Sequence, residues 1–337
     1  MMISFWAPPH LTRDRLFAEG HRDDCLAAYR AVKNGVERRE GLCHTQDWYH
    51  DERRVPDVVI FMDIPKEPLQ ELLGPWYAAA RRWVILQEPP IIIPRNFEMG
   101  RHADYERFFT WNDALLGDSR YRKLNYCHQF PDRKEGFDVG TRKLCVMIAG
   151  NRRSDHPLEL YAAREQAVRW FETHHSEDFD LYGFGWDRRV FGGNRLMRAM
   201  NRVGWLGRLL ALPYPSWRGT VAEKRAVLAR YRFAICYENC RDLPGYITEK
   251  IFDCFFAGCV PVYWGANNIT DYIPAGCFID QRQFPDMETL YGFLRGMSEE
   301  AFQGYLSRIE WFLRGPSAYP FKAECFAETI ISEFARE

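Results

Sequence analysis

Residues 231–265 constrain the fold more than any other part of the chain. Their sequence is YRFAICYENCRDLPGYITEKIFDCFFAGCVPVYWG. The apolar run Phe233–Cys236 ends at a polar pair, a loop follows, and Tyr246–Lys250 opens an apolar pattern with helical spacing. Gly258 ends that pattern, and a second run with the features of a strand, Cys259–Trp264, comes next. This order of strand, loop, helix and strand is typical of nucleotide sites in α/β proteins, where polar groups gather at strand ends and helix starts.

Length and composition indicate a folded, soluble protein of two domains. The chain has 337 residues, of which 47% are hydrophobic and 27% are charged. A net charge of −1 gives the whole protein no attraction to nucleic acid. No apolar run reaches the roughly 18 residues of a membrane span, and the segment MMISFWAPPH lacks the features of a signal peptide. The ten cysteines show no C-x-x-C spacing, so we expect reduced thiols and a cytoplasmic location.

The first part of the chain alternates between predicted strands and predicted helices. Ile3–Trp6, Val58–Met62 and Trp83–Leu86 are short apolar runs bounded by turn or charged residues, as expected of strands. Between them, Arg13–Val36 and Glu67–Arg82 have apolar residues at helical spacing. This alternation predicts a parallel sheet with helices on its faces.

A second α/β unit is predicted to start near Arg142. Its first predicted strand is Leu144–Ala149. Pro157 suits the first turn of the next helix, which would bury Leu160, Tyr161, Val168 and Phe171. The later predicted elements are a strand at Asp180–Tyr182, a helix at Val221–Ala229, and a mostly helical tail, Met287–Glu337, broken at Gly315-Pro316.

The signature region resembles the α-1,3-fucosyltransferase family. The family motifs occur here in the same order, as Tyr237-Glu238-Asn239, Tyr246–Lys250, Gly258 and Val260-Pro261-Val262. The resemblance implies an α/β fold with two facing Rossmann-like domains, called GT-B, and an active site in the cleft between them. It also implies residues 1–140 as the acceptor domain, 141–315 as the GDP-fucose domain, and 316–337 as a helical segment that packs back on the first. Eukaryotic members carry a membrane anchor, so a chain without one resembles the bacterial enzymes.

By this resemblance, the reaction moves L-fucose from GDP-β-L-fucose to a sugar hydroxyl with inversion. One displacement then requires a base on the acceptor and cations on the departing diphosphate. Lys250, in the first turn of its helix, and Arg164, in the pattern Arg-x-x-x-Val-x-x-Phe, are the candidates for the diphosphate. The alternative for each is a solvated cation on a helix face.

Three further residues are candidates for donor binding. Glu249 would accept hydrogen bonds from the ribose, while Asn239 and Tyr246 would position the nucleotide or the fucose. The alternatives are a first-turn carboxylate that stabilises its helix, a turn former and a packed aromatic ring, respectively. We expect Glu238 to brace the loop without touching substrate.

The predicted base is Glu88, which follows the strand Trp83–Leu86 and precedes Pro89-Pro90. In the family, a Glu after an aromatic-containing strand is the proposed base, and this match is partial. Apolar flanks would raise the pKa of such a carboxyl toward the range where a base works near neutral pH. A surface-loop Glu is the alternative, and Glu98 and Asp63 are competing bases.

The sequence predicts no metal site, because the nine histidines show no ligand spacing and no Asp-x-Asp motif occurs. No cofactor is therefore expected beyond the co-substrate GDP-fucose, although stimulation by a divalent cation stays open. A Gly-x-x-x-x-Gly-Lys loop is also absent, which argues against an ATPase or kinase.

Residues 188–218 depart from the shorter connection of the family. They contain seven Arg and no acidic residue, together with several large apolar side chains. One interpretation is an amphipathic insertion that lies peripherally on the inner face of the membrane, near a lipid-linked acceptor. The other is a loop and helix packed over the donor domain.

The resemblance implies an N-acetyllactosamine-type glycan as acceptor, fucosylated at O3 of GlcNAc, on an oligosaccharide or on a glycolipid such as lipopolysaccharide. Two alternatives remain open. One is a glycosyltransferase that uses another nucleotide sugar, and the other is a catalytically silent, glycan-binding relative. Retention of Lys250 and Glu249 in one motif argues against the silent relative.

Overall fold

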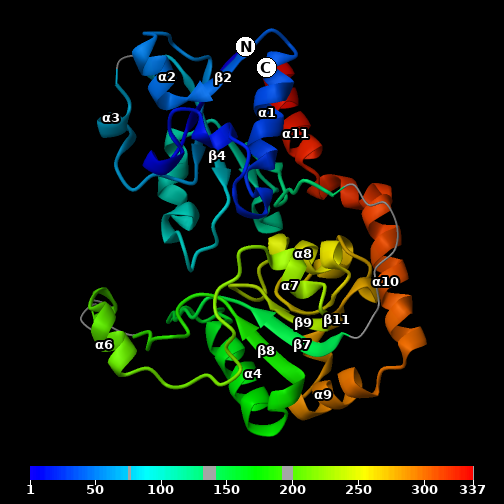
Figure 1. Cartoon of the computed structure of the whole chain (residues 1–337). Coiled ribbons are helices and arrows are strands. Elements are labelled where there is room, and N and C mark those ends of the chain that lie inside the picture. Colours follow the sequence, from blue (N-terminus) through cyan, green and yellow to red (C-terminus); the bar gives the residue numbers. More distant parts are fainter. Residues whose placement is uncertain (75–76, 132–141, 192–199, 337) are drawn as a thin grey trace. The chain divides into compact units, whose positions relative to one another are not determined.

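The computed structural model describes residues 1–74, 77–131, 142–191 and 200–336, which form two compact units (Figure 1). The first unit comprises Met1–Phe130, Pro244–Tyr246 and Ala318–Glu337. The second comprises Pro131–Leu243 and Ile247–Ser317. The predicted domain boundary at residues 140 and 141 falls within 132–141, outside the described residues, so the predicted division stays a prediction.

A parallel sheet of six strands forms the centre of the first unit. Its order, β2-β1-β3-β4-β5-β6, places β1 between the two strands that follow it in sequence. Every neighbouring pair in this sheet is parallel. The strands are β1 (Met2–Trp6), β2 (Leu42–Thr45), β3 (Val58–Met62), β4 (Arg81–Leu86), β5 (Arg107–Thr110) and β6 (Tyr121–Lys123).

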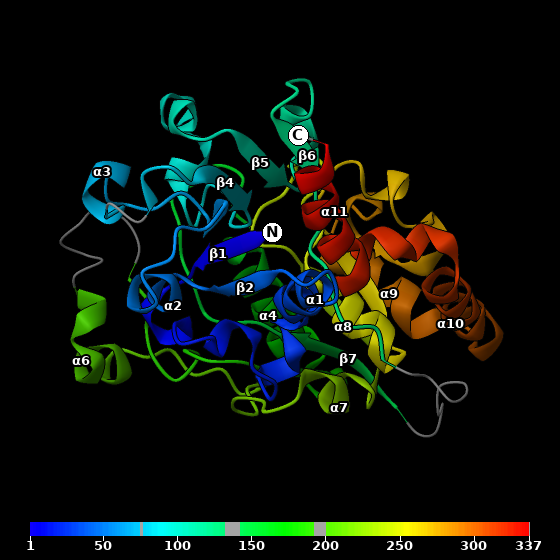
Figure 2. The same cartoon turned by 90° about the horizontal axis from the view of Figure 1, so that it is seen from above.

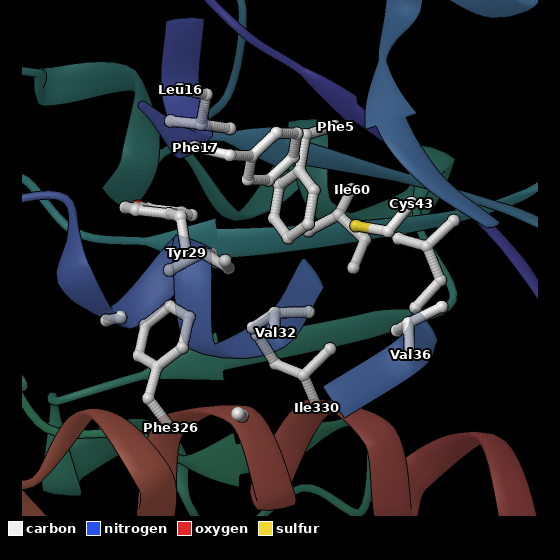
Figure 3. Packing of buried hydrophobic residues seen from close by; sticks show 14 of the residues in the cluster. Phe5, Leu16, Phe17, Tyr29, Val32, Val36, Cys43, Ile60, Phe326 and Ile330 are labelled. Atoms are coloured by element: carbon white, nitrogen blue, oxygen red, sulfur yellow. The ribbon is translucent and has the colours of Figure 1, made fainter. Parts of the chain in front are cut away.

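Apolar clusters cover both faces of this sheet. Successive residues of β3 alternate between them, so that Ile60 belongs to one cluster and Phe61 to the other. On the Ile60 face, helix α1 (Ala27–Glu37) packs beside α11 (Ala323–Ala335), which comes from the end of the chain (Figure 2). Figure 3 shows the resulting core, whose labelled residues include Phe5, Tyr29, Val32, Phe326 and Ile330.

The opposite cluster lies on the Phe61 face and includes Tyr49 from helix α2 (Gln46–Asp51). Because β3 is buried on both sides, its sequence is a continuous apolar run without alternation.

Two of the predicted helices in this unit are wrong in extent. The pattern over Arg13–Val36 becomes a helix only in α1, because Asp14 has a positive φ of 56° and binds Thr45 through its carboxylate. The pattern over Glu67–Arg82 gives only α3 (Leu69–Leu72). Arg81 and Arg82 instead extend β4, where they pair with β3.

The second unit contains a five-stranded parallel sheet in the order β11-β10-β9-β7-β8. Its strands are β7 (Lys143–Ile148), β8 (Phe179–Tyr182), β9 (Tyr231–Tyr237), β10 (Val260–Trp264) and β11 (Ile279–Asp280). Its helices are α4 (Tyr161–His174), α6 (Gly204–Leu209), α7 (Lys224–Leu228), α8 (Glu249–Ala257), α9 (Met287–Gly296) and α10 (Glu299–Arg314).

The helix starts in this unit differ from the predicted ones. Helix α4 begins at Tyr161, four residues after Pro157, because the Glu159 carboxylate accepts the N–H groups of Tyr161 and Ala162. Helix α8 begins at Glu249, later than the Tyr246 start that the pattern indicates. Its end is as predicted, with Gly258 in the left-handed region at a φ of 67°.

Among the residues that the structure describes, no helix is both long enough and apolar enough to cross a lipid bilayer.

Candidate donor-binding site

A buried carboxylate links the end of β9 to the start of α8. Glu238 follows the last residue of β9 and is fully buried. Its Oε1 accepts the N–H of Thr248 at 2.8 Å, and its Oε2 accepts the Thr248 hydroxyl at 2.7 Å. Thr248 is the residue at which α8 is capped. Glu238 therefore braces the loop, as the sequence predicted.

Lys250 uses the same carboxylate as its counter-ion. Its Nζ lies 3.1 Å from Oε2 of Glu238 and 3.7 Å from Oε1 of Glu249, and it donates to the Thr248 hydroxyl at 3.0 Å. Burial alone would lower the pKa of Lys250, but the negative charges of Glu238 and Glu249 outweigh burial and raise it. The ammonium group is therefore charged at neutral pH.

Arg164 reaches the same strand end from α4. Its Nη2 donates to the carbonyl of Tyr237 at 2.6 Å and to Oδ1 of Asn239 at 3.1 Å. The side chain is buried, and the positive charge of Arg164 acts to lower the pKa of Lys250. The structure thus brings these two cations together, in an arrangement that an anion between them would stabilise.

The other predicted donor-binding residues differ in their surroundings. Asn239 accepts from Arg164 through its side chain and from the N–H of Leu160 through its carbonyl, so it fixes the guanidinium. The Glu249 side chain is 44% exposed and lies 3.9 Å from Lys224. Its exposure leaves it accessible to a ligand hydroxyl.

Tyr246 is placed differently, because its side chain is 1% exposed. It groups with the first unit, where its ring centre lies 4.8 Å from that of Trp111 and 6.0 Å from that of Tyr126. This is the packed aromatic that the sequence left as the alternative, and a contact to the donor stays a prediction.

The turn that carries Glu88 is held by hydrogen bonds in the first unit. Oδ1 of Asp63 accepts the N–H of Gln87 at 2.7 Å and that of Glu88 at 3.0 Å. Asn96, fully buried, donates from Nδ2 to Asp63 at 2.7 Å and to the Glu88 carbonyl at 3.0 Å. Its Oδ1 accepts the N–H of Ile64 at 3.0 Å. These bonds satisfy the backbone of Glu88.

Side chains from three other segments hold Gln87. Its carbonyl accepts the indole N–H of Trp111 at 2.8 Å and the hydroxyl of Tyr126. Its side-chain oxygen accepts the hydroxyl of Tyr29 at 2.9 Å. The turn directly after β4 is therefore fixed from several sides, and the half-buried Glu88 is the ionisable group that it presents.

The two competing bases have other roles in the structure. Asp63 is buried, and burial raises its pKa although the three donors on Oδ1 oppose the change. Glu98 is exposed and forms an ion pair with Arg101 at 2.7 Å. The local chemistry therefore favours Glu88, whose assignment as the base stays a prediction.

One family model matches a range that covers most of the second unit. Residues 164–322 match the model described as glycosyltransferase family 10 (fucosyltransferase) C-term. This segment is therefore similar to the C-terminal domain of that family. It contains the Arg164 and Lys250 cation pair and the whole signature loop, so the resemblance inferred from the signature is confirmed.

Sequence relatives of the chain are matched over short stretches. An α-(1,4)-fucosyltransferase of Arabidopsis thaliana is 30% identical over 113 residues, which are 31% of this chain and 27% of the relative. The α-(1,3)-fucosyltransferase FucT of Helicobacter pylori is 29% identical over 75 residues, which are 22% of this chain and 16% of the relative. The chain thus spans about a quarter or less of these relatives' own lengths.

A solved structure extends the likeness to the whole fold. A crystal structure of an α1,3-fucosyltransferase has a TM-score of 0.55 at 12% identity and covers 98% of this chain and 88% of its own. The predicted fold class, two α/β units of the GT-B type, is confirmed.

The matched range 164–322 includes the whole basic segment 188–218, of which 192–199 lie outside the described residues. Trp205 and Leu209, on α6, are 69% and 72% exposed. Arg188 and Arg208 pair with Asp187, and Arg218 pairs with Asp180.

Sequence reasoning missed several residues that shape the two regions. Asn96 lies eight residues beyond Glu88, in a segment with no recognised motif, and nothing in the sequence signals its role. Tyr161 was expected only to fill the core, yet it contacts Arg164 with its ring, 5.2 Å from the guanidinium.

Within the described part of the chain, no cluster of His, Cys, Asp and Glu could hold a metal ion.

Proposed function

We propose that the chain is an inverting fucosyltransferase that moves L-fucose from GDP-β-L-fucose to a sugar hydroxyl. The observation that carries this proposal is the convergence of Arg164 and Lys250 at the end of β9, within the range that matches the family 10 model. Two fixed cations can neutralise a diphosphate leaving group, and Glu249 beside them can accept from ribose hydroxyls.

In the proposed reaction, the acceptor oxygen attacks the anomeric carbon of fucose while the bond to the GDP oxygen breaks. The departing diphosphate takes the electron pair and is stabilised by Arg164 and Lys250. The Glu88 carboxylate takes the proton of the acceptor hydroxyl. Asn239 would hold Arg164 in place, and Tyr246 would help to position the donor. The first unit would hold the acceptor and the second the donor.

For the acceptor, we propose O3 of GlcNAc in an N-acetyllactosamine-type glycan, free or on a glycolipid such as lipopolysaccharide. The α-(1,3)-fucosyltransferase of Helicobacter pylori among the relatives supports this linkage. No metal is required in this proposal, because the cation pair performs the neutralisation. Transfer should therefore persist in EDTA, and added Mg²⁺ should at most stimulate it.

The decisive experiment incubates the purified protein with GDP-fucose and a glycan panel and reads the products by mass. Transfer from GDP-mannose or a UDP-sugar instead would identify another donor, and binding of a glycan without transfer would identify a silent relative. In the same assay, Lys250→Ala should weaken GDP binding roughly tenfold or more, while Lys250→Arg should retain part of it.

Glu88→Gln separates the base from the donor site. It should leave GDP affinity unchanged and lower the transfer rate by about 10²–10⁴-fold. The matched control is Glu98→Gln, which alters an exposed carboxylate in the same unit and should transfer normally. Near-normal turnover of Glu88→Gln would rule out this residue as the base.

We also propose that the protein is cytoplasmic and that its basic segment rests on an anionic membrane surface. Trp205 and Leu209 are four residues apart on α6, so they share one helix face, and both are largely exposed. In sequence, the segment 188–218 contains seven Arg and no acidic residue. Exposed apolar side chains among cations suit the interface of a bilayer that carries negative headgroups.

This contact is tested by sedimentation with vesicles of phosphatidylcholine, with and without phosphatidylglycerol. Binding should require the anionic lipid, weaken with added salt, and be lost in the double variant Trp205→Ala/Leu209→Ala. Trp311→Ala is the control, since Trp311 is equally exposed but lies on α10. Equal sedimentation of the double variant and wild type would contradict the proposal.

A further inference from the structure

Tyr161, the first residue of α4, has a buried hydroxyl group that lacks a hydrogen-bond partner among the described residues. The side chain is 5% exposed, and none of the described residues forms a hydrogen bond with its hydroxyl group. A buried hydroxyl that bonds neither protein nor water costs free energy, so such groups are rare in folded proteins. The orphaned hydroxyl therefore points to a partner that joins the protein later.

The surroundings of this hydroxyl indicate the charge of that partner. The guanidinium of Arg164 lies over the Tyr161 ring, 5.2 Å from its centre. The positive charges of Arg164, Arg152 and Lys250 all act on the phenol. Burial nevertheless raises the pKa of Tyr161, so the group stays protonated at neutral pH and can donate.

The nearby protein acceptors are engaged with other donors. The Glu159 carboxylate accepts the first N–H groups of α4, Asn239 accepts from Arg164, and Glu238 accepts from Thr248. A ligand oxygen could therefore serve as the acceptor for the Tyr161 hydroxyl, and an anion suits a site among three positive charges.

We propose that Tyr161 is a further diphosphate-binding residue, whose hydroxyl donates a hydrogen bond to a phosphate oxygen beside Arg164 and Lys250. The inference rests on the proposed function and assigns a residue to the same site. A neutral donor adds a directed hydrogen bond without adding to the repulsion between the two cations. Because the hydroxyl is unsatisfied in the free protein, its bond forms only in the complex.

The test is Tyr161→Phe in the full chain, with GDP and guanosine titrated by calorimetry. We expect the dissociation constant for GDP to rise roughly tenfold or more, with the affinity for guanosine unchanged. The melting temperature without nucleotide should stay the same or rise, because no hydrogen bond within the protein is lost.

Tyr214→Phe is the matched control, since the Tyr214 hydroxyl donates to Glu165 of the same helix at 2.7 Å. This variant should melt at a lower temperature and bind GDP normally. A Tyr161→Phe variant that melts lower as Tyr214→Phe does, or that binds GDP as wild type does, would overturn the assignment. Failure of the wild type to bind GDP would instead overturn the proposed function.

Discussion

Glu238 and Asp63 are buried carboxylates that directly follow a central parallel strand, one in each unit, yet their partners differ. Glu238, after β9, holds the ammonium of Lys250 as well as Thr248. Asp63, after β3, accepts three N–H groups, from Gln87, Glu88 and Asn96. One carboxylate therefore has a full counter-charge, and the other is stabilised mainly by dipoles.

The difference matches what each carboxylate positions. Glu238 fixes a cation, and the attraction between opposite charges offsets the desolvation of both groups. Asp63 fixes the turn that presents another carboxylate, Glu88, so a cation placed there would neutralise the proposed base. Amide donors hold the turn without that effect. A carboxylate at the end of a strand can thus position either a cation or another carboxylate. Which of the two it positions depends on whether the neighbouring segment supplies a charged or an amide donor.

The largest effect should follow from Glu238→Gln, which keeps the shape and removes the counter-charge of Lys250. We expect a loss of about 3 kcal/mol in the free energy of unfolding, measured by urea denaturation, because the half-buried Lys250 keeps only the more distant and more exposed carboxylate of Glu249. Glu299→Gln is the control, since its ion pair with Arg232 is exposed and should contribute under about 1 kcal/mol. Equal losses in the two variants would remove the contrast between Glu238 and Asp63.

A third buried carboxylate, Asp180 on β8, extends the comparison to pH. Burial would raise its pKa, but hydrogen bonds from Lys143, Tyr231 and Arg218 outweigh burial and lower it. The ionised Asp180 therefore stabilises the folded protein at pH values above its ordinary pKa of 3.8. This stabilisation is lost as the pH falls through the lowered pKa. Asp180→Asn should cost about 2 kcal/mol at neutral pH, and the difference from wild type should shrink in acid.

The smallest effect on stability, about 1 kcal/mol, is expected for Asp63→Asn, and its pH dependence should have the opposite sign. Burial raises the pKa of Asp63, so the native state binds more protons than the unfolded state above pH 3.8. Wild type should therefore lose stability relative to the variant as pH rises from that value. Urea denaturation at a series of pH values measures the free energy of unfolding of wild type and of both variants. If the difference from wild type changed with pH in the same direction for Asp63→Asn and Asp180→Asn, this interpretation would be contradicted.

Strands buried on both faces were predictable, and short polar ones were not. Val58–Met62 was predicted with its observed bounds, because a strand between two apolar clusters needs apolar residues throughout. Leu42–Thr45 was missed, since its four residues include His44, which pairs with Asp14 from a distant segment. The helix predicted over Glu67–Arg82 has apolar residues at helical spacing. Its last residues, however, belong to β4, where they pair with β3.

For the candidate site, the signature showed which residues lie together at the start of α8, but not what surrounds Glu88. Glu249 and Lys250 follow each other in sequence, so one helix start places both. Whether Glu88 is held rigidly depends on Asn96 and Tyr126, which only the fold brings near it. The Tyr161 hydroxyl, which has no hydrogen-bond partner in the described part of the chain, was beyond prediction, because an absent contact leaves no pattern in a sequence.

Helix α11 contributes Phe326 and Ile330 to a core that otherwise consists of residues from the beginning of the chain (Figure 3). During translation, the first unit therefore has to wait until the entire second unit has emerged from the ribosome before its core can close. In that interval Tyr29 lacks Phe326, against which its ring packs, and a nascent chain with such an incomplete core is prone to aggregation. The order of synthesis thus makes the second unit the earlier of the two to complete its fold.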